Sequence, residues 1–348
     1  MSEERIETDG DAGVNAGARP RILVLTSDAL FPHFFPRHVL ARLGEVGEWE
    51  HFDGREDSAG LRARLARADA LMTTWHSPFL RMEMLGEARR VRMIAHCGGE
   101  LKARMEPEVV GTLTVANAPG PMAAPVAEMA LAMVLTLVRR LPDYDREMRA
   151  GAVRTNEVVS RGETVRGRRL GVVGFGRIGR AFARMVAPLG AELYVSDPYC
   201  SEETAAEHGA KKVGAEELLR ESSVVVLAAG LTDETRHMLD ARRLALMPDG
   251  AYLVNVGRGG LIETEALLAE LRSGRISAAL DVTDPLEPLP PDHELRRLPN
   301  VLLTPHVAAG GIEMRHALGE TAADEVARFF RGERLENVVT PEMLARMT

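Results

Sequence analysis

Cysteine and lysine are both scarce in this chain, and each scarcity narrows what the protein can be. The 348 residues include two cysteines, Cys97 and Cys200, which are too few for a disulfide framework and lack metal-ligand spacing. We therefore expect a cytoplasmic protein without a metal site. Lysine occurs only at positions 102, 211 and 212, so arginines spread among acids carry nearly all the positive charge. With a formal net charge of -8, this pattern argues against nucleic acid as the main partner.

Long uninterrupted apolar runs are also missing. The most apolar stretch, residues 122–138, contains Pro125 and Glu128 and is short for a membrane span, so it predicts a buried or interface helix. Residues 1–19 are acidic and rich in Gly and Ala, without the basic start and apolar middle of a signal peptide. We expect a disordered tail there and no association with a membrane.

The stretch 169–180 has the pattern of a strand, a turn and a helix. Residues 170–173 form the short apolar run that a buried parallel strand needs, and apolar residues then recur at helical spacing. Between them lies a Gly-x-Gly-x-x-Gly motif. Gly174 is predicted to allow a tight turn, Gly176 the approach of a pyrophosphate, and Gly179 close packing of the helix on its strand.

An acidic residue follows this motif at the distance expected of a dinucleotide site. The helix is predicted to stop at Gly190, a second strand spans 192–195, and Asp197 stands at its carboxyl end. A carboxylate there accepts hydrogen bonds from the ribose hydroxyls and repels a 2′-phosphate, which predicts NAD(H) in preference to NADP(H). The alternative is a structural glycine turn, which the ordered set of neighbouring signals makes the weaker interpretation.

Further strands continue from this motif and predict an α/β fold with two domains. Six strands separated mostly by helical segments predict a doubly wound parallel sheet in an NAD-binding Rossmann domain at residues 122–309. These strands are expected at 170–173, 192–195, 224–227, 251–254, 277–280 and 301–303.

The region before the glycine motif is predicted to be a smaller β/α domain without a nucleotide loop. Its strands are expected at 22–25, 70–73, 91–95 and 114–116, and its helices at 39–43 and 61–65. A helix at 125–141 leads into the NAD-binding domain. An amphipathic helix at about 314–330 is predicted to pack back on the first region, which makes the substrate domain discontinuous, with residues 20–121 and 310–348.

Three polar residues lie just past the last three predicted strands. Arg258, Glu287 and His306 would meet at the carboxyl edge of the sheet, where ligands of open parallel sheets bind. A guanidinium can hold a carboxylate in a fork, an imidazolium can donate a proton to a forming alkoxide, and a carboxylate can orient that imidazole. The pattern therefore predicts hydride transfer to a 2-keto acid. Singly, each residue has a structural alternative: a surface loop, a solvated loop and a core histidine, respectively.

Together these motifs resemble the D-isomer specific 2-hydroxyacid dehydrogenase family, which includes phosphoglycerate, glycerate and D-lactate dehydrogenases. The resemblance covers nearly all of the chain after the tail. The stretches that carry it are Asn117–Gly120, Val126–Glu128, Gly174–Gly179, Leu231–Thr235, Asn255–Gly259, Asp281–Pro285 and Leu303–His306.

The resemblance implies a flavodoxin-like substrate domain, a homodimer joined along the NAD-binding domains, and roles for individual residues. Arg258, Glu287 and His306 are the implied catalytic set, and Gly98 and Gly99 are the implied sources of backbone N–H groups for the substrate carboxylate. Asp281 is implied to lie near the nicotinamide carboxamide. The residues expected to contact the cofactor are Gly174, Phe175, Gly176, Arg177, Ile178, Gly179, Asp197, Thr232, Val256, Gly257 and Asp281.

The chain departs from the family pattern in several places. Residues 97–102 replace the usual Gly-x-Gly-x-Asp-Asn run, and Leu286 stands as one extra residue before the Glu-Pro pair. Ala228 and Gly230 occupy positions where His and Pro are usual, and Ala309 replaces a usual Gly.

Two functions from different classes follow. The first is an NAD-dependent dehydrogenase that interconverts a small 2-keto acid and a D-2-hydroxy acid. The second is a dinucleotide-sensing interaction protein on the same scaffold, as in the C-terminal binding protein corepressors. The formate dehydrogenase branch is disfavoured because it carries an amide where Glu287 stands. The sequence does not specify the acid: Trp75, His76 and Ser77 either reach the pocket mouth or form an apolar strand end with a capping serine.

Overall fold

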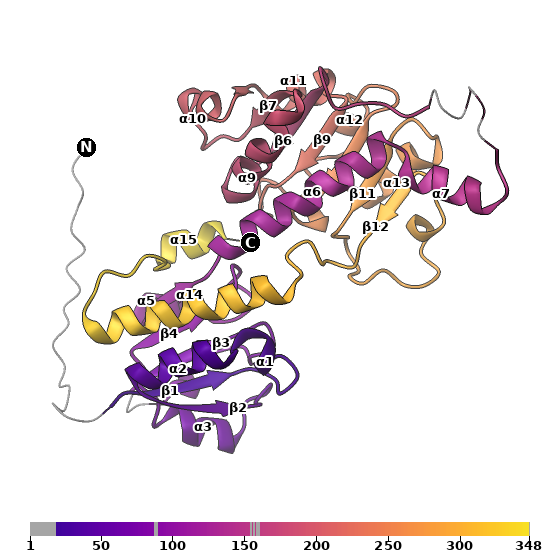
Figure 1. The fold of residues 1–348 in the computed structure, drawn as a ribbon. Coiled ribbons are helices and arrows are strands. Elements are labelled where there is room, and N and C mark those ends of the chain that lie inside the picture. Colours follow the sequence, from indigo (N-terminus) through magenta and orange to yellow (C-terminus); the bar gives the residue numbers. More distant parts are fainter. Residues whose placement is uncertain (1–18, 87–89, 154, 156, 158–160, 348) are drawn as a thin grey trace.

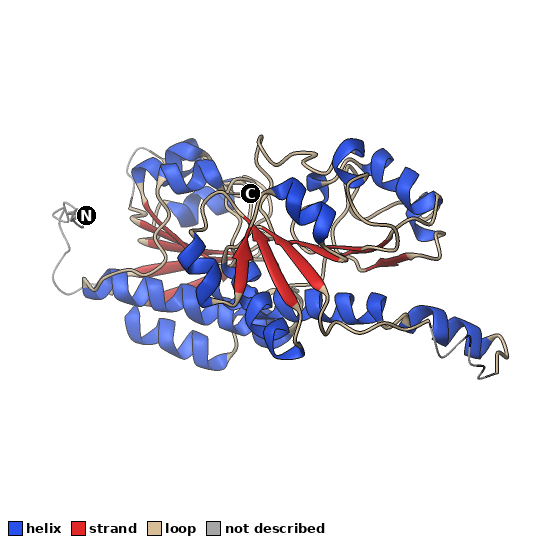
Figure 2. Ribbon diagram, turned by 90° about the horizontal axis from the view of Figure 1, so that it is seen from above, coloured by secondary structure: helices blue, strands red, loops and turns tan. Residues whose placement is uncertain are grey.

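The computed structural model describes residues 19–86, 90–153, 155, 157 and 161–347, so nearly all of the predicted tail lies outside the described residues. Two parallel sheets, each covered by helices, form the two parts of the molecule (Figure 1). The view from above shows helices on both sides of the strands (Figure 2). The predicted two-domain α/β fold is confirmed.

The smaller sheet has the strand order β2-β1-β3-β4-β5 with every pair parallel. This order is that of flavodoxin-like domains, which confirms the prediction for the first region. Strands β3 and β4 lie inside the sheet and are buried throughout, so their apolar runs were readable in the sequence. The strands are β1 (Arg21–Leu25), β2 (Glu48–Phe52), β3 (Ala70–Thr73), β4 (Met93–His96) and β5 (Thr114–Asn117).

The larger sheet has the order β12-β11-β10-β9-β6-β7-β8, again all parallel. Counted from β6, this is the 3-2-1-4-5-6 order of a Rossmann domain with one added strand. The topological switch point lies between β6 and β9. The strands are β6 (Arg169–Val173), β7 (Glu192–Ser196), β8 (Ala210–Lys212), β9 (Val224–Leu227), β10 (Tyr252–Asn255), β11 (Ser277–Leu280) and β12 (Val301–Leu303).

Two edge strands were missing from the prediction, which expected six strands in the larger sheet and omitted β2 from the smaller one. Strand β2 has the sequence Glu-Trp-Glu-His-Phe with its first three residues exposed, and β8 is the three-residue run Ala-Lys-Lys. An edge strand pairs on one side only and needs no continuous apolar run. The hydrophobic pattern therefore carries little signal for either strand.

The helix expected at 125–141 is divided in two. Helix α6 (Ala123–Val138) ends before Arg140, whose left-handed backbone (φ 54°) precedes α7 (Leu141–Arg149). Helix α6 packs against α9 (Arg177–Val186), β10 and β11, while α7 extends to the edge of the molecule (Figure 1). The stretch 120–138 is the one described helical segment long and apolar enough to cross a membrane by length and composition.

The remaining helices are short, apart from α14 (Ile312–Arg331). The α-helices are α1 (Phe31–Phe34), α2 (Arg37–Val46), α3 (Ala59–Leu65), α4 (Met82–Leu85), α5 (Pro107–Thr112), α10 (Glu202–Glu207), α11 (Ala215–Glu221), α12 (Ala241–Leu244), α13 (Thr264–Arg272) and α15 (Pro341–Arg346). Single 3₁₀ turns are η1 (Gly120–Met122), η2 (Ala187–Leu189), η3 (Gly259–Leu261) and η4 (Glu294–Arg296).

Helix α14 follows the larger sheet in sequence but packs on the smaller one, against α1, α2 and β4. The chain crosses from β5 to α6 through residues 118–122 and returns from β12 to α14 through residues 304–311. The predicted domain boundaries at 121/122 and 309/310 fall within these two connections.

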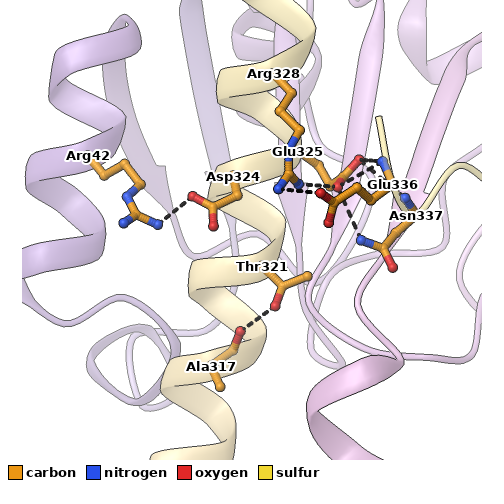
Figure 3. Close-up of polar contacts among 8 residues, drawn as sticks. All are labelled: Arg42, Ala317, Thr321, Asp324, Glu325, Arg328, Glu336 and Asn337. Carbon is orange, nitrogen blue, oxygen red and sulfur yellow. Dashed lines mark hydrogen bonds and ion pairs between the residues drawn. The ribbon is translucent and has the colours of Figure 1, made fainter. Parts of the chain in front are cut away.

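A buried carboxylate ties α14 to the C-terminal segment (Figure 3). Glu325 has no exposed surface and accepts hydrogen bonds from the backbone N–H groups of Glu336 and Asn337. The Asn337 amide (3.1 Å) and the Arg328 guanidinium (2.7 Å) complete its partners. Because each buried oxygen is satisfied and the charge is paired, this cluster fixes the returning chain against the helix.

We expect Glu325→Gln to lower the free energy of unfolding by about 1–3 kcal/mol, because an amide NH₂ would then face hydrogen-bond donors and Arg328 would lose one of its two carboxylate partners, keeping only Glu336. Urea denaturation measures the change. Asp324→Asn is the matched control, since Asp324 forms an exposed ion pair with Arg42 (Figure 3) and should cost less than about 1 kcal/mol. Equal losses in the two variants would contradict the account.

Candidate functional site

The three glycines of the motif differ in what surrounds them. Gly174 has a φ of 88°, and a Cβ atom there would lie 2.5 Å from the backbone of Ala229. A Cβ atom on Gly179 would lie 2.3 Å from the carbonyl oxygen of Gly174, so the helix can pack on its strand only without a side chain at that position. Gly176 faces open space, with nothing within 4 Å of its Cβ position. A ligand can therefore approach the backbone at Gly176.

A basic pocket of about 590 Å³ adjoins this open backbone. Arg177, Arg180 and Arg184 lie at helical spacing on α9 and supply its positive charge. The other lining residues are Gly120, Ala123 and Gly176. The free N–H groups of the first turn of α9 add to the positive potential of the pocket, so the pocket suits the phosphates of a dinucleotide.

Asp197 lies beside the glycine loop and is half-buried. Its Oδ2 accepts a hydrogen bond from the Phe175 N–H (2.6 Å), and its Oδ1 accepts one from the Tyr199 N–H (2.8 Å). These bonds fix the carboxylate at the carboxyl end of β7, and each oxygen keeps a lone pair for a further donor. The glycine loop and Asp197 together fit a bound nicotinamide dinucleotide.

His306 and Glu287 are brought together at the carboxyl edge of the larger sheet. Nδ1 of His306 lies 3.0 Å from Oε1 of Glu287, and both side chains remain partly exposed. The extra residue Leu286 points outward and is 50% exposed, so it does not displace Glu287. Asp284, the other acid on this loop, lies 3.8 Å from His237.

The backbone at His306 is held in a left-handed conformation (φ 53°) by the buried side chain of Asp281. Asp281 is 1% exposed, and its carboxylate accepts hydrogen bonds from Val307 N–H (2.9 Å), Ala308 N–H (2.8 Å) and the Thr304 hydroxyl. The Asp281 carbonyl accepts a fourth bond from the His306 N–H (2.8 Å). Left-handed backbone is strained for a non-glycine residue, so these bonds supply the constraint that sustains it.

Two hydrogen bonds made by the side chain of Asn255 fix the loop after β10, which carries Arg258. The buried Asn255 amide donates to the Arg258 carbonyl (2.9 Å), and its Oδ1 accepts from the Gly257 N–H (3.0 Å). Burial lowers the pKa of Arg258, while the nearby negative charges of Glu100 and Glu287 act in the opposite direction. No carboxylate of the described residues lies within 4.0 Å of this guanidinium, so it can receive an anion.

Glycines also let the loops at this edge approach one another. A Cβ atom on Gly259 would lie 2.2 Å from the Thr283 carbonyl, so the loop carrying Arg258 packs against the loop carrying Glu287. A Cβ atom on Gly257 would lie 2.7 Å from the Ala229 carbonyl oxygen, which brings the loops after β9 and β10 together. Val256 is buried there, and Thr232 lies in the same loop after β9 as Ala229.

The loop after β4 faces Arg258 from the smaller domain. The Gly98 N–H is already bonded to the His96 carbonyl (2.9 Å), so Gly99 is the better placed of the two predicted donors. The Gly99 carbonyl accepts from the side chain of Asn117 (2.9 Å), and the Asn117 N–H donates to Asn337 (3.1 Å). Gly99 is thereby tied, through Asn337, to the buried cluster of α14.

Sequence reasoning missed several residues that build this site. Asn117 and Asn255 belong to the motifs listed above but were given no role. Both are polar residues at the ends of buried strands, and this position is a signal from which a role could have been predicted. Glu100 was taken only as part of a loop, whereas its charge acts on Arg258. The support that Asp281 gives to His306 depends on side-chain direction, for which the sequence offers no signal.

Comparison with known proteins gives a consistent family. A family model described as D-isomer specific 2-hydroxyacid dehydrogenase, NAD binding domain, matches residues 131–308. A glyoxylate reductase of Aeropyrum pernix is 33% identical over 333 residues, which cover 94% of this chain and 97% of that protein. A D-3-phosphoglycerate dehydrogenase of Methanocaldococcus jannaschii is 32% identical over 300 residues, 85% of this chain and 56% of that protein.

Solved structures agree in fold. The crystal structure of the TT0316 protein from Thermus thermophilus superposes with a TM-score of 0.76 at 32% identity, covering 92% of this chain and all of that one. The glycine loop, the strand order and these similarities show that the chain belongs to the D-isomer specific 2-hydroxyacid dehydrogenase family and is an NAD-dependent enzyme of that family.

Proposed function

We propose that this enzyme reduces a small 2-keto acid to the D-2-hydroxy acid with NADH, using Arg258, His306 and Glu287. The observation that carries the proposal is the 3.0 Å contact between His306 and Glu287 at the sheet edge that also carries Arg258. The Arg258 guanidinium donates to the Gly257 carbonyl (2.8 Å) and has no carboxylate of the described residues within 4.0 Å. Gly99 would add a backbone N–H from the smaller domain, and Gly98 would support its loop. The names of the glyoxylate reductases and phosphoglycerate dehydrogenases that the chain resembles support this class of substrate.

In the proposed mechanism, Arg258 binds the substrate carboxylate through two parallel hydrogen bonds and polarises the keto group. NADH, when held by the glycine loop and Asp197, would supply the hydride. As the carbonyl carbon takes that electron pair, the oxygen becomes an alkoxide and receives the proton from the imidazolium of His306. Glu287 keeps the ring oriented and stabilises its charged form before the transfer.

The cofactor contacts follow from the same geometry. We infer that Gly176, Arg177 and Ile178 at the start of α9 hold the pyrophosphate, with Gly174, Phe175 and Gly179 shaping the turn. Asp197 would bind the adenine ribose and favour NAD(H) over NADP(H). Thr232, Val256 and Gly257 would line the nicotinamide half of the site. A contact between Asp281 and the carboxamide stays a prediction, since its carboxylate is buried against its own loop.

We also propose a cytoplasmic homodimer joined along the NAD-binding domains, without a membrane or nucleic-acid partner. Helix α6 supports this, because the stretch 120–138 is strongly apolar, yet only 39% of it is buried within the chain. In α7 and the residues just after it, three apolar side chains are exposed: Leu141 (54%), Met148 (63%) and Val153 (73%). A second copy would cover both surfaces.

The function is tested by following NADH oxidation with glyoxylate, hydroxypyruvate, pyruvate and bulkier keto acids. We expect turnover with at least one small acid, and a loss of about 10²- to 10⁴-fold in kcat for His306→Gln with NADH binding retained. NADH binding without turnover of any acid would instead favour the dinucleotide-sensing interaction protein. A general loss of folding in His306→Gln would point to a structural histidine.

The partner of His306 can be tested by comparing two variants of the same loop. Glu287→Gln removes the charge that lies 3.0 Å from Nδ1 of His306, so it should lower kcat for keto-acid reduction while NADH binding is retained. Asp284→Asn is the control and should leave kcat in place. The reverse result would assign the role to Asp284.

Cofactor preference is tested at Asp197. We expect NADH to be used better than NADPH, and we expect Asp197→Ala to raise KM for NADH by removing charge-assisted hydrogen bonds worth roughly 1.5–3 kcal/mol. The KM for NADPH should rise less, since a repelling charge is also removed. The comparison of kcat/KM for both cofactors in both proteins decides the point. Comparable values for NADH and NADPH in the unmodified enzyme would refute the assignment.

A further inference from the structure

The loop that carries Glu287 has little backbone support of its own. It follows β11 and runs from Val282 to Leu289, which are both buried. Among the described residues, no backbone–backbone hydrogen bond begins or ends within 282–289. Because Glu287 is assigned to orient His306, whatever fixes this loop bears on proton transfer. The inference below therefore rests on the proposed function.

Side chains from neighbouring elements fix the two ends of the loop. The hydroxyl of Thr264, at the start of α13, donates to the Asp284 carbonyl (2.6 Å). At the other end, the guanidinium of Arg296 in η4 donates to the Leu289 carbonyl (2.6 Å). Residues 285–288, which include the acid, are all exposed and lie between these two fixed points.

One hydroxyl inside the loop holds this middle part. Oγ1 of Thr283 donates to the carbonyl of Leu286 (2.7 Å), a local bond from a threonine side chain to the backbone three residues on. In the part of the chain that the structure describes, no other side chain is hydrogen-bonded to the backbone of 285–288. The Leu286 carbonyl belongs to the peptide group that leads into Glu287, so this bond sets the direction in which the chain enters the acid.

Leu286 is also the residue by which this loop exceeds the family pattern. One added residue lengthens an extended chain by about 3.3–3.6 Å, enough to break a hydrogen bond if nothing absorbs it. The contact between Glu287 and His306 is nevertheless kept at 3.0 Å, and the Leu286 side chain is 50% exposed. The bond from Thr283 accounts for both observations, because it draws the Leu286 carbonyl back toward the start of the loop and turns the extra residue outward.

We propose that Thr283 is a positioning residue for keto-acid reduction, whose hydroxyl absorbs the extra residue Leu286 and thereby keeps Glu287 beside His306. Thr283 acts through Glu287 and takes no part in the transfer of hydride or proton. A loop without the extra residue needs no such bond, so the requirement for the hydroxyl belongs to the longer loop of this chain.

The first test measures kcat with the keto acid that is turned over fastest. Thr283→Val keeps the shape of the side chain but loses the hydroxyl, so kcat should fall by about two- to tenfold while the Kd for NADH is unchanged. Thr283→Ser keeps the hydroxyl and should retain kcat. If Thr283→Val fails to fold, Thr283→Ala removes the same hydroxyl without added bulk.

Thr321→Val is the matched control. The Thr321 hydroxyl also donates to a backbone carbonyl, that of Ala317 (2.8 Å), but it lies on α14 in the smaller domain (Figure 3). The same substitution there should leave kcat unchanged. An equal loss of kcat in Thr283→Ser, or in Thr321→Val, would overturn the inference.

Two double variants separate positioning from a general effect on the fold. In the Glu287→Gln background, Thr283→Val should cause no further loss of kcat, because the carboxylate that it positions is gone. In a variant that lacks Leu286, Thr283→Val should also lose its effect, since no extra residue has to be absorbed. If the shortened loop is itself inactive, the Glu287→Gln background decides.

The outcomes distinguish this inference from the proposed function. An undiminished effect of Thr283→Val in the Glu287→Gln background would overturn the inference alone. So would an unchanged kcat in Thr283→Val while Glu287→Gln loses activity. Full activity of Glu287→Gln, or absence of turnover with every acid, would overturn the proposed function and this inference with it.

Discussion

The buried carboxylate of Asp281 is the constraint on which the geometry of the site depends. It accepts bonds from three donors on the loop after β12, while the carbonyl of the same residue holds the His306 N–H. These four bonds keep His306 in a left-handed conformation that it would not adopt freely. The imidazole is thereby placed beside Glu287, and the proposed proton transfer would need no rearrangement of this loop.

The charges around Arg258 come from both domains. Arg258 is half-buried and lacks a carboxylate within 4.0 Å among the described residues, but the charges of Glu287 in the larger domain and Glu100 in the smaller one act on it. Glu100 belongs to the smaller domain and follows the loop assigned to the substrate carboxylate. A substrate carboxylate at Arg258 would therefore compete with an acid already near it, so binding has to rely on the fork geometry and on the Gly99 N–H.

The sequence predicted those parts of the fold that a hydrophobic pattern can specify. Central strands such as β6 and β9 are buried on both faces, and their Val- and Leu-rich runs stand out between helical segments. Edge strands β2 and β8 are short or polar and show no such apolar run in the sequence. The boundary between α6 and α7 was missed by a few residues: Pro142 in the first turn of α7 marks a helix start, but the break itself rests on the left-handed backbone of Arg140, which the sequence does not show.

The sequence predicted the site residues that follow strand ends but not those that act through the direction of their side chains. Arg258, Glu287 and His306 follow strand ends, and parallel strands place their ends at one edge, so their proximity could be inferred. Asp281, Asn255 and Asn117 contribute through the direction of their side chains within the packed loops, which depends on tertiary structure. The same holds for Trp75, which the sequence left either at the pocket mouth or at an apolar strand end, and whose indole lies beside Gly98.

The central claim is that hydride and proton reach a keto acid from fixed sides, with Arg258 and His306 setting its orientation. Reduction of hydroxypyruvate with NADH that carries deuterium at both C4 positions tests this most directly. The account predicts glycerate of the D configuration with one deuterium on C2. The L configuration, a racemic mixture, or product without deuterium would contradict it.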